Sequence, residues 1–310
     1  MKDHKIETTE IELDFTPNFD VSLFVKREDK IHPFISGNKF RKLKYNFFDA
    51  KEKGFKQLLT FGGAYSNHIS AVASLGHEFG FKTIGVIRGD ELGQNLQYTF
   101  DQNPTLKLAS EQGMVFEFVS RPLYREKENE TFINSLGKKF GEFYLIPEGG
   151  TNELAIKGCE EILTEKDEIF DYICVAVGTG GTIAGVINSS SIHQKVLGFP
   201  ALKGDFLTEE IEKYTIRMGS WSLINDYHFG GYGKVNEDLI NFINKFRFDK
   251  NIPLDPIYTG KMFYGIFELI KKGFFFKGAK ILVVHTGGLQ GIKGMNKQFE
   301  RKKIPLKIYE

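Results

Sequence analysis

The chain has 310 residues, of which 41% are hydrophobic and 26% are charged, the composition of an ordinary globular protein. Its 41 basic and 40 acidic residues leave a net charge of +1, so no overall field recruits nucleic acid or an anionic membrane. Two cysteines without metal-ligand spacing exclude a disulfide framework, and because we find neither a signal peptide nor a bilayer-length apolar segment, we expect a soluble, cytoplasmic protein.

Short apolar runs alternate with amphipathic stretches along most of the chain. The runs are rich in Val, Ile and Phe and end at glycine or a polar turn, as buried parallel strands do. We predict strands at residues 23–26, 57–61, 83–87, 115–119, 143–146, 173–177, 195–199 and 281–285. Helices are predicted between them, with apolar faces formed by Phe40, Leu43 and Phe47 in one case and by Leu239, Phe242, Ile243 and Phe246 in another. This alternation favours an α/β fold with parallel sheets, and the length favours two lobes.

The first motif that suggests chemistry is the segment at residues 36–43, Ser-Gly-Asn-Lys-Phe-Arg-Lys-Leu. Gly37 permits a turn, and either Ser36 or Asn38 can cap the helix that follows. Lys39 then lies at the positive end of the helix dipole, where a cation is disfavoured. One interpretation is a solvated basic face that continues through Lys42. The other is a desolvated lysine with a lowered pKa, because Schiff-base chemistry needs a neutral amine.

The second motif, Phe-Gly-Gly-Ala-Tyr-Ser-Asn-His at residues 61–68, follows a predicted strand and precedes a helical pattern. Ser66, Asn67 and His68 can serve a ligand together, or the first two can simply cap the next helix. A serine hydrolase is disfavoured because the Gly-x-Ser-x-Gly spacing of a nucleophile elbow is missing.

The third motif, Gly-Thr-Gly-Gly-Thr at residues 178–182, connects an apolar run to a helical pattern. Such a turn presents several backbone N–H groups to an anion, although it can also be a tight structural turn. No Walker lysine follows, and Ile183 occupies the third glycine position of the dinucleotide pattern. The acid expected farther along is also missing, which opposes a nicotinamide dehydrogenase. We therefore predict binding of a phosphate that is not part of a nucleotide.

Two later turns also place polar residues beside a predicted helix or strand. Residues 255–261 lead into a helical pattern, and residues 283–288 end an apolar strand. Polar groups at the carboxyl ends of parallel strands lie where α/β proteins usually bind ligands. His285 taken alone is more typical of a hydrogen-bonded core histidine than of a catalyst.

In this order, the motifs resemble those of the fold-type II pyridoxal-phosphate enzymes, more narrowly the branch that contains D-cysteine desulfhydrase and 1-aminocyclopropane-1-carboxylate (ACC) deaminase. The patterns Ser-Gly-Asn-Lys-x-Arg-Lys, Gly-Gly-x-x-Ser-Asn-His and Gly-Thr-Gly-Gly-Thr carry the resemblance, which covers nearly the whole chain. It implies a two-lobe, tryptophan synthase β-like architecture with parallel-rich twisted sheets. Residues 1–42 and 148–310 would form a larger cofactor-binding lobe, residues 43–147 a smaller α/β lobe, and two copies a homodimer.

The resemblance also implies roles for individual residues. Lys39 would hold pyridoxal 5'-phosphate as a Schiff base and move the substrate's Cα proton. Ser66, Asn67 and His68 would bind the substrate, and Asn67 would also bond the cofactor's phenolic oxygen. Ser66 would hold the substrate carboxylate or assist proton transfer. The cofactor's phosphate would be held by the main chain of Gly178, Thr179, Gly180, Gly181 and Thr182.

The later turns complete this set of implied roles. Tyr258 and Tyr232 look like the active-site tyrosines of the family, and Thr259 would contact the substrate. Thr286 would face the cofactor's pyridine nitrogen, to which its hydroxyl can hydrogen-bond without adding negative charge. The deaminases resemble each other in having Glu and Leu at the positions of Thr259 and Thr286.

These differences favour D-cysteine desulfhydration to pyruvate, sulfide and ammonia over ACC deamination. His68 also fits the desulfhydrase pattern, whereas the deaminases have glutamine at this position. Two positions depart from the branch, which often has Gln at the position of Tyr65 and Arg at that of Ser70. These two departures leave open a different substrate, or a relative that binds the cofactor but has little catalytic turnover.

Overall fold

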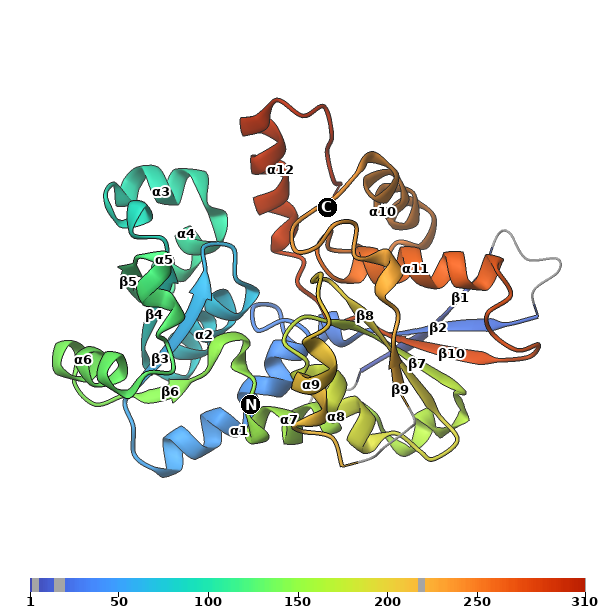
Figure 1. Cartoon of the computed structure of the whole chain (residues 1–310), viewed down its shortest axis with the longest axis horizontal. Helices are drawn as coiled ribbons and strands as arrows, with labels where there is room; N and C mark the ends of the chain where they lie inside the picture. The colour runs from blue at the N-terminus through green and yellow to red at the C-terminus, as the bar shows by residue number, and fades with distance from the viewer. Residues whose placement is uncertain (2–5, 14–19, 217–220, 310) are drawn as a thin grey trace.

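The computed structural model describes residues 1, 6–13, 20–216 and 221–309. Within these residues the strands form two sheets (Figure 1), which lie side by side and define a small lobe and a large lobe. The sheet of the small lobe has the order β5-β4-β3-β6, and that of the large lobe has the order β1-β2-β10-β7-β8-β9. No helix among the described residues is long and apolar enough to cross a bilayer.

All eight predicted strands are present within one or two residues of their expected bounds. They are β2 (Ser22–Lys26), β3 (Gln57–Gly63), β4 (Lys82–Arg88), β5 (Val115–Val119), β6 (Tyr144–Ile146), β7 (Tyr172–Val177), β8 (Lys195–Pro200) and β10 (Lys280–Val284). The pattern missed β1 (Thr8–Ile11) and β9 (Trp221–Leu223), which are short edge strands with little buried apolar surface. Every pairing is parallel except that of β1 with β2, which confirms the expected α/β class with parallel-rich sheets.

The large sheet is built from both ends of the described chain, because β2 pairs directly with β10. The small sheet uses only strands between Gln57 and Ile146. Helix α1 (Asn38–Glu52) runs without interruption across the predicted boundary between residues 42 and 43. The division into residues 1–42 with 148–310, and 43–147, stays a prediction.

Helices cover the sheets of both lobes (Figure 1). Those that follow α1 in and around the small lobe are α2 (Asn67–Phe79), α3 (Leu96–Gln102), α4 (Pro104–Glu111), α5 (Arg121–Arg125) and α6 (Glu130–Phe140). The remaining helices are α7 (Glu153–Glu160), α8 (Gly181–Ser189), α9 (Leu207–Glu212), α10 (Glu237–Lys250), α11 (Thr259–Lys271) and α12 (Gly291–Lys302). Helix α12 extends from the large lobe and packs against α4 of the small lobe.

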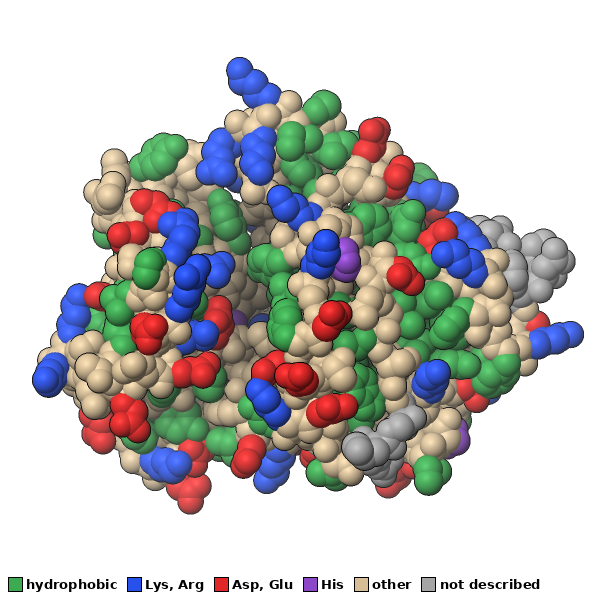
Figure 2. All heavy atoms as spheres, viewed as in Figure 1, with side chains coloured by type: hydrophobic (Ala, Val, Ile, Leu, Met, Phe, Trp, Pro, Cys, Tyr) green, Lys and Arg blue, Asp and Glu red, His purple; other side chains and the backbone are tan. Residues whose placement is uncertain are grey.

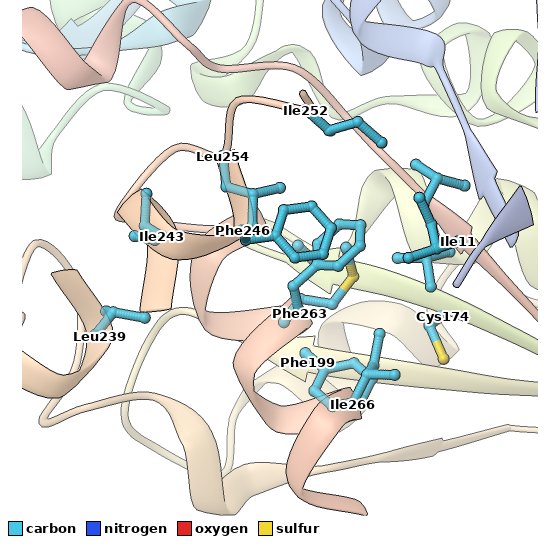
Figure 3. Packing of buried hydrophobic residues seen from close by; sticks show 14 of the residues in the cluster. Ile11, Cys174, Phe199, Leu239, Ile243, Phe246, Ile252, Leu254, Phe263 and Ile266 are labelled. Carbon is cyan, nitrogen blue, oxygen red and sulfur yellow. The ribbon is translucent and has the colours of Figure 1, made fainter. Parts of the chain in front are cut away.

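Apolar side chains of α10 and α11 form the main core on one face of the large sheet (Figure 3). The face predicted for residues 239–246 packs here, where the rings of Phe246 and Phe263 lie 4.9 Å apart. Phe40, Leu43 and Phe47 of α1 are buried in a second core that reaches the small lobe. Cys159 and Cys174 are free and buried, as small apolar side chains usually are.

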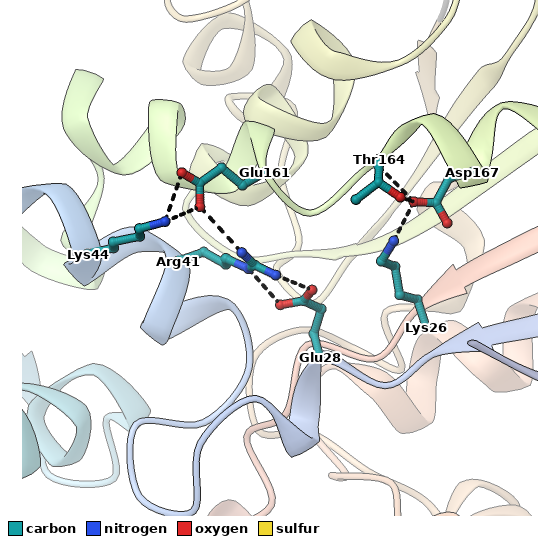
Figure 4. Close-up of polar contacts among 7 residues, drawn as sticks. All are labelled: Lys26, Glu28, Arg41, Lys44, Glu161, Thr164 and Asp167. Carbon is teal, nitrogen blue, oxygen red and sulfur yellow. Dashed lines mark hydrogen bonds and ion pairs between the residues drawn. The ribbon is translucent and has the colours of Figure 1, made fainter. Parts of the chain in front are cut away.

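Buried ion pairs fix helix α1 (Figure 4). The guanidinium of Arg41 donates to both carboxylate oxygens of Glu28, each at 3.0 Å, and Glu28 is completely buried. Arg41 also donates to Glu161 at 3.4 Å, and Lys44 pairs with the same carboxylate at 2.7 Å. Because two forked groups meet in a bidentate arrangement, this contact sets the orientation of α1 as well as its position.

Removing one partner of this pair tests its importance for stability. Glu28→Ala leaves the buried Arg41 charge without its main partner, and we expect the free energy of unfolding to fall by about 3 kcal/mol or more. Urea unfolding followed by circular dichroism measures this change. Asp249→Ala is the control, because it removes an exposed pair with Lys245 and should cost less than about 0.5 kcal/mol. Equal losses in the two variants would contradict the anchoring role of Glu28.

Candidate active site

The candidate site lies where the parallel strands of both sheets end. Strand β7 leads into the glycine-rich turn before α8, and β10 leads into residues 285–288. Strand β3 leads into the turn at residues 64–66 before α2. The start of α1 completes the arrangement, because the Asn38 side chain donates to the Thr182 hydroxyl at 2.8 Å.

Lys39 lies in the first turn of α1, directly against the segment that follows β10. Gly37 is the N-cap residue with a φ of 58°, and a Cβ at this position would lie 1.9 Å from the Thr286 carbonyl oxygen. The same carbonyl accepts the Asn38 N–H at 3.2 Å. Only glycine allows this close approach, so the turn brings Lys39 beside Thr286. Neither Ser36 nor Asn38 caps the helix, which corrects the sequence prediction.

The Lys39 amine has the electrostatic environment that Schiff-base chemistry requires. Burial lowers its pKa to about 8. The amine makes no hydrogen bond or ion pair among the described residues. A fraction of the side chain is therefore neutral near physiological pH, and its lone pair is free.

Lys42 lies one turn farther along α1 and is buried rather than solvated. Its amine donates to the Gly149 carbonyl and the Thr151 hydroxyl, both at 2.7 Å, and to the Thr179 hydroxyl at 3.4 Å. Burial, with the nearby charge of Lys39, holds its pKa well below the ordinary value. The interpretation of this segment as a solvated basic face is thus wrong, because Arg41, Lys42 and Lys44 are all buried. Arg41 and Lys44 form ion pairs, and Lys42 is hydrogen-bonded.

The glycine-rich turn presents unused donors at the start of α8. The N–H groups of residues 179–182 donate to no acceptor among the described residues. They point from a helix N-terminus, where an anion is favoured. The hydroxyls of Thr179 and Thr182 are tied to Lys42 and Asn38, so the turn is held against α1.

Three of the predicted residues lie at the start of α2, and their contacts differ. Ser66 caps α2 by accepting the Ile69 N–H at 3.3 Å. Asn67 has a buried Oδ1 with no partner among the described residues. His68 lies 2.8 Å from the Thr60 hydroxyl, which itself donates to a carbonyl, so Nε2 of His68 carries the proton. Burial, with the charges of Lys39 and Lys42, lowers the pKa of His68.

One predicted tyrosine lies against the glycine-rich turn, and the second packs on the first. The Tyr258 ring approaches Gly178 so closely that a Cβ there would lie 3.1 Å from it. The Tyr232 ring packs edge to face on Tyr258, with 6.1 Å between centroids. Burial raises the pKa of Tyr258, so its hydroxyl stays protonated. The structure thus brings both predicted tyrosines to the site.

The side chains of Thr259 and His285 make hydrogen bonds within the protein. The Thr259 hydroxyl accepts the Asp255 N–H at 2.9 Å and donates to the Asp255 carboxylate at 2.7 Å, and its role toward a substrate stays a prediction. His285 accepts the Gly287 N–H on Nδ1 and donates from Nε2 to Pro253. It is therefore a buried, hydrogen-bonded core histidine, as its sequence context suggested.

The comparisons with known proteins agree on one family. The family model described as "Pyridoxal-phosphate dependent enzyme" matches residues 3–287. A Pyrococcus horikoshii protein provisionally named as an ACC deaminase is 31% identical over 303 residues, with 91% of this chain and 90% of that protein covered. A bifunctional D-cysteine desulfhydrase/ACC deaminase of Arabidopsis thaliana is 30% identical, with coverage of 87% and 73%. The solved structure of an ACC deaminase homologue superposes with a TM-score of 0.79, covering 96% of this chain and 93% of that one at 28% identity.

The residues at the site fit a phosphate-bearing aldehyde cofactor. The unused N–H groups of residues 179–182 match its phosphate, and the free amine of Lys39 matches its carbonyl group. The buried Oδ1 of Asn67, an acceptor without a partner among the described residues, offers a further polar contact. No group of three or more metal-ligating side chains is found among the described residues. Sequence reasoning missed Lys42 as a site residue because neighbouring basic residues suggested a solvated face.

The lowered pKa of Lys39 gives a test on the cofactor-free protein. The neutral fraction of the amine rises with pH and reaches half at about pH 8. Reductive methylation of Lys39 by formaldehyde should therefore rise with pH and level off just above this value. Mass spectrometry of the peptide, with fragmentation to separate Lys39 from Lys42, measures the rate, and Lys39→Arg identifies the signal. A rate that rises with a midpoint at the ordinary value of 10.5 would contradict desolvation of Lys39.

Proposed function

The chain belongs to the family of pyridoxal-phosphate-dependent enzymes, and we propose that it breaks down a small amino acid, most specifically D-cysteine to pyruvate, sulfide and ammonia. The observation that carries the proposal is the unpaired Lys39 amine, with its pKa of about 8, beside the anion-binding turn at residues 178–182. The relatives named above, which include a D-cysteine desulfhydrase, support the same class of chemistry.

Each part of the site contributes a separate function in this proposal. When bound, the cofactor withdraws electrons from the substrate's Cα, so that bonds to this carbon break more readily. Lys39 takes the Cα proton on Nζ, because its lowered pKa keeps a neutral form available. Lys42 holds α1 against residues 149–151 and Thr179, and so keeps Lys39 in place. The N–H groups of residues 179–182 hold the phosphate.

Thr286 and Thr259 favour desulfhydration over ACC deamination. ACC has no Cα proton, and opening its ring needs a stronger electron sink, which a carboxylate beside the pyridine nitrogen would promote. Thr286 lies beside the start of α1 and has a hydroxyl instead. Asp255 is close to Gly288, but its carboxylate accepts the N–H groups of residues 257–259 and the Thr259 hydroxyl.

ACC deamination is the second candidate, because several relatives carry that name. A relative with little turnover is the third. This candidate is suggested by Tyr65, which lines a cleft between the two lobes. The Tyr65 ring packs on Gly294 of α12, where a Cβ would lie 2.8 Å from the ring. Ser70 is buried within α2 and adds no charge to the cleft.

Keto-acid release by the purified holoenzyme separates the three candidates. We expect pyruvate and sulfide from D-cysteine, and no 2-oxobutanoate from ACC. Lys39→Ala should abolish turnover together with the yellow absorbance of the lysine-linked cofactor, because the neighbouring amine of Lys42 is held by hydrogen bonds to residues 149, 151 and 179. Lys51→Ala, an exposed lysine at the far end of the same helix, is the control and should retain both.

Each alternative result has a distinct meaning. Release of 2-oxobutanoate from ACC would favour the deaminase and contradict the argument from Thr259 and Thr286. Cofactor binding without turnover of D-cysteine, L-cysteine or ACC would favour the third candidate. Turnover retained by Lys39→Ala would refute the whole assignment.

A further inference from the structure

Tyr232 lies in a loop with an unusual backbone. Four of the five residues at 229–233 have a positive φ, between 54° and 113°, and one of these four, Phe229, is not a glycine. A left-handed conformation is costly for a residue with a side chain, so contacts elsewhere must stabilise this loop. Tyr232 is 46% exposed, and its own packing therefore does little to fix the loop.

Two consecutive turns shape this loop. The Gly231 N–H donates to the His228 carbonyl at 3.0 Å, and the Lys234 N–H donates to the Gly231 carbonyl at 3.1 Å. Tyr232 is the residue that directly follows Gly231, inside the second turn. Both hydrogen bonds are internal to the loop, so they give it a shape without fixing its position against the rest of the large lobe.

Lys261 joins both turns to helix α11. Its amine donates to the same two carbonyls, to that of His228 at 2.9 Å and to that of Gly231 at 2.7 Å, and these are its hydrogen-bond partners among the described residues. Lys261 is 2% exposed, and burial lowers its pKa to about 8, against the opposing charge of Asp255. A buried amine is costly unless it is hydrogen-bonded. Here both bonds go to the loop of Tyr232.

The start of α11 therefore holds both tyrosines. Tyr258 is the N-cap residue of α11, and its N–H donates to the Asp255 carboxylate at 2.9 Å. Lys261 lies in the first turn of the same helix and holds the loop of Tyr232. The rings of Tyr232 and Tyr258 then meet edge to face. Loss of the Lys261 amine would thus release Tyr232 and leave Tyr258 in place.

Tyr232 also lies within electrostatic reach of the cleft between the lobes. This cleft of about 710 Å³ is visible as the hollow between the lobes in Figure 2, and Arg88 and Glu148 line it. Burial raises the pKa of Tyr232, Arg88 opposes this rise, and Glu148 adds to it. A substrate bound between the lobes would therefore meet a tyrosine whose position depends on Lys261.

We propose that Lys261 is a positioning residue of the candidate site, which holds Tyr232 against Tyr258 for the reaction. It acts through the carbonyls of His228 and Gly231, and in this assignment it touches neither substrate nor cofactor. The proposal rests on the proposed function, because it takes Tyr232 to contact the substrate. When the amine is removed, both carbonyls keep their N–H partners within the turns, so the loop loses its attachment and keeps its internal bonds.

Lys261→Met tests the attachment without relying on turnover. Methionine has a similar volume and no donor, and an apolar group of the same shape in place of a buried polar one leaves folding largely intact. We expect amide exchange at residues 228–234 to quicken about tenfold or more, the effect of losing hydrogen bonds from a charged group. Exchange in α10 should stay unchanged.

Hydrogen–deuterium exchange of the holoenzyme, read by mass spectrometry, measures this change. Unchanged exchange at residues 228–234 in Lys261→Met would overturn the proposal. Lys261→Gln, which keeps a shorter polar side chain, serves the same comparison where Lys261→Met does not fold.

Turnover of D-cysteine tests the role in the reaction. In Lys261→Met, kcat/KM should fall about tenfold or more, because a misplaced group at a reacting centre has effects of this size. The yellow absorbance of the bound cofactor should stay. Tyr232→Phe should also lower kcat/KM, and adding Lys261→Met to it should lower kcat/KM by less than about twofold further. Effects of residues that act through one another do not add, whereas independent effects do.

Lys272→Met is the matched control. Lys272 directly follows α11, and its exposed amine donates to the Tyr227 hydroxyl at 3.2 Å, just ahead of the same loop. Both measurements should change by less than about twofold. Equal effects in Lys272→Met and Lys261→Met would overturn the proposal. Full additional losses in the double variant, or unchanged turnover in Tyr232→Phe, would overturn it as well.

The exchange measurement separates this proposal from the proposed function. If the wild type turns over no amino acid, the proposed function fails, and with it the role of Lys261 in the reaction. The attachment of the loop then still stands where exchange at residues 228–234 quickens in Lys261→Met and not in Lys272→Met. Turnover of D-cysteine with loop exchange and kcat/KM that do not depend on Lys261 would refute the positioning role and leave the proposed function intact.

Discussion

The buried pairing of Arg41 with Glu28 is the interaction on which the rest of the site depends. It orients α1 through two hydrogen bonds of 3.0 Å, and the nearby Glu161 carboxylate is taken by Arg41 and Lys44. The same helix carries Lys39, whose amine makes no hydrogen bond or ion pair among the described residues. Because no acid pairs with this amine, burial lowers its pKa to about 8.

Close backbone approach is the second constraint, and glycine provides it. The positive φ of Gly37 lets the start of α1 touch the Thr286 carbonyl, where no side chain would fit. A Cβ on Gly181 would lie 2.8 Å from Thr151, so the turn before α8 is also packed without space for a side chain. These contacts join segments far apart in the sequence and leave the N–H groups of residues 179–182 open to an anion.

The two lobes contribute different residues to the site. The large lobe contributes the glycine-rich turn at residues 178–182 and both tyrosines, whereas the small lobe contributes Ser66, Asn67 and most of the residues that line the cleft between the lobes. Tyr65 and α12 connect the lobes at the far side of this cleft. A small amino acid held between them would meet groups from both sheets, so the relative position of the lobes bears directly on substrate choice.

The sequence by itself determined the eight main strands, the class of fold and the motifs at residues 36–43, 61–68 and 178–182, because apolar periodicity and glycine-rich turns are local properties. It could not determine β1 and β9, whose few residues pair only because a neighbouring strand is present. It mistook Lys42 for a solvated residue, since burial depends on what packs over a side chain from elsewhere in the chain. Arg88 carried no signal beyond its place at the end of a strand. Only the tertiary structure left it unpaired beside Gly63, because charge pairing is decided by contacts between distant segments.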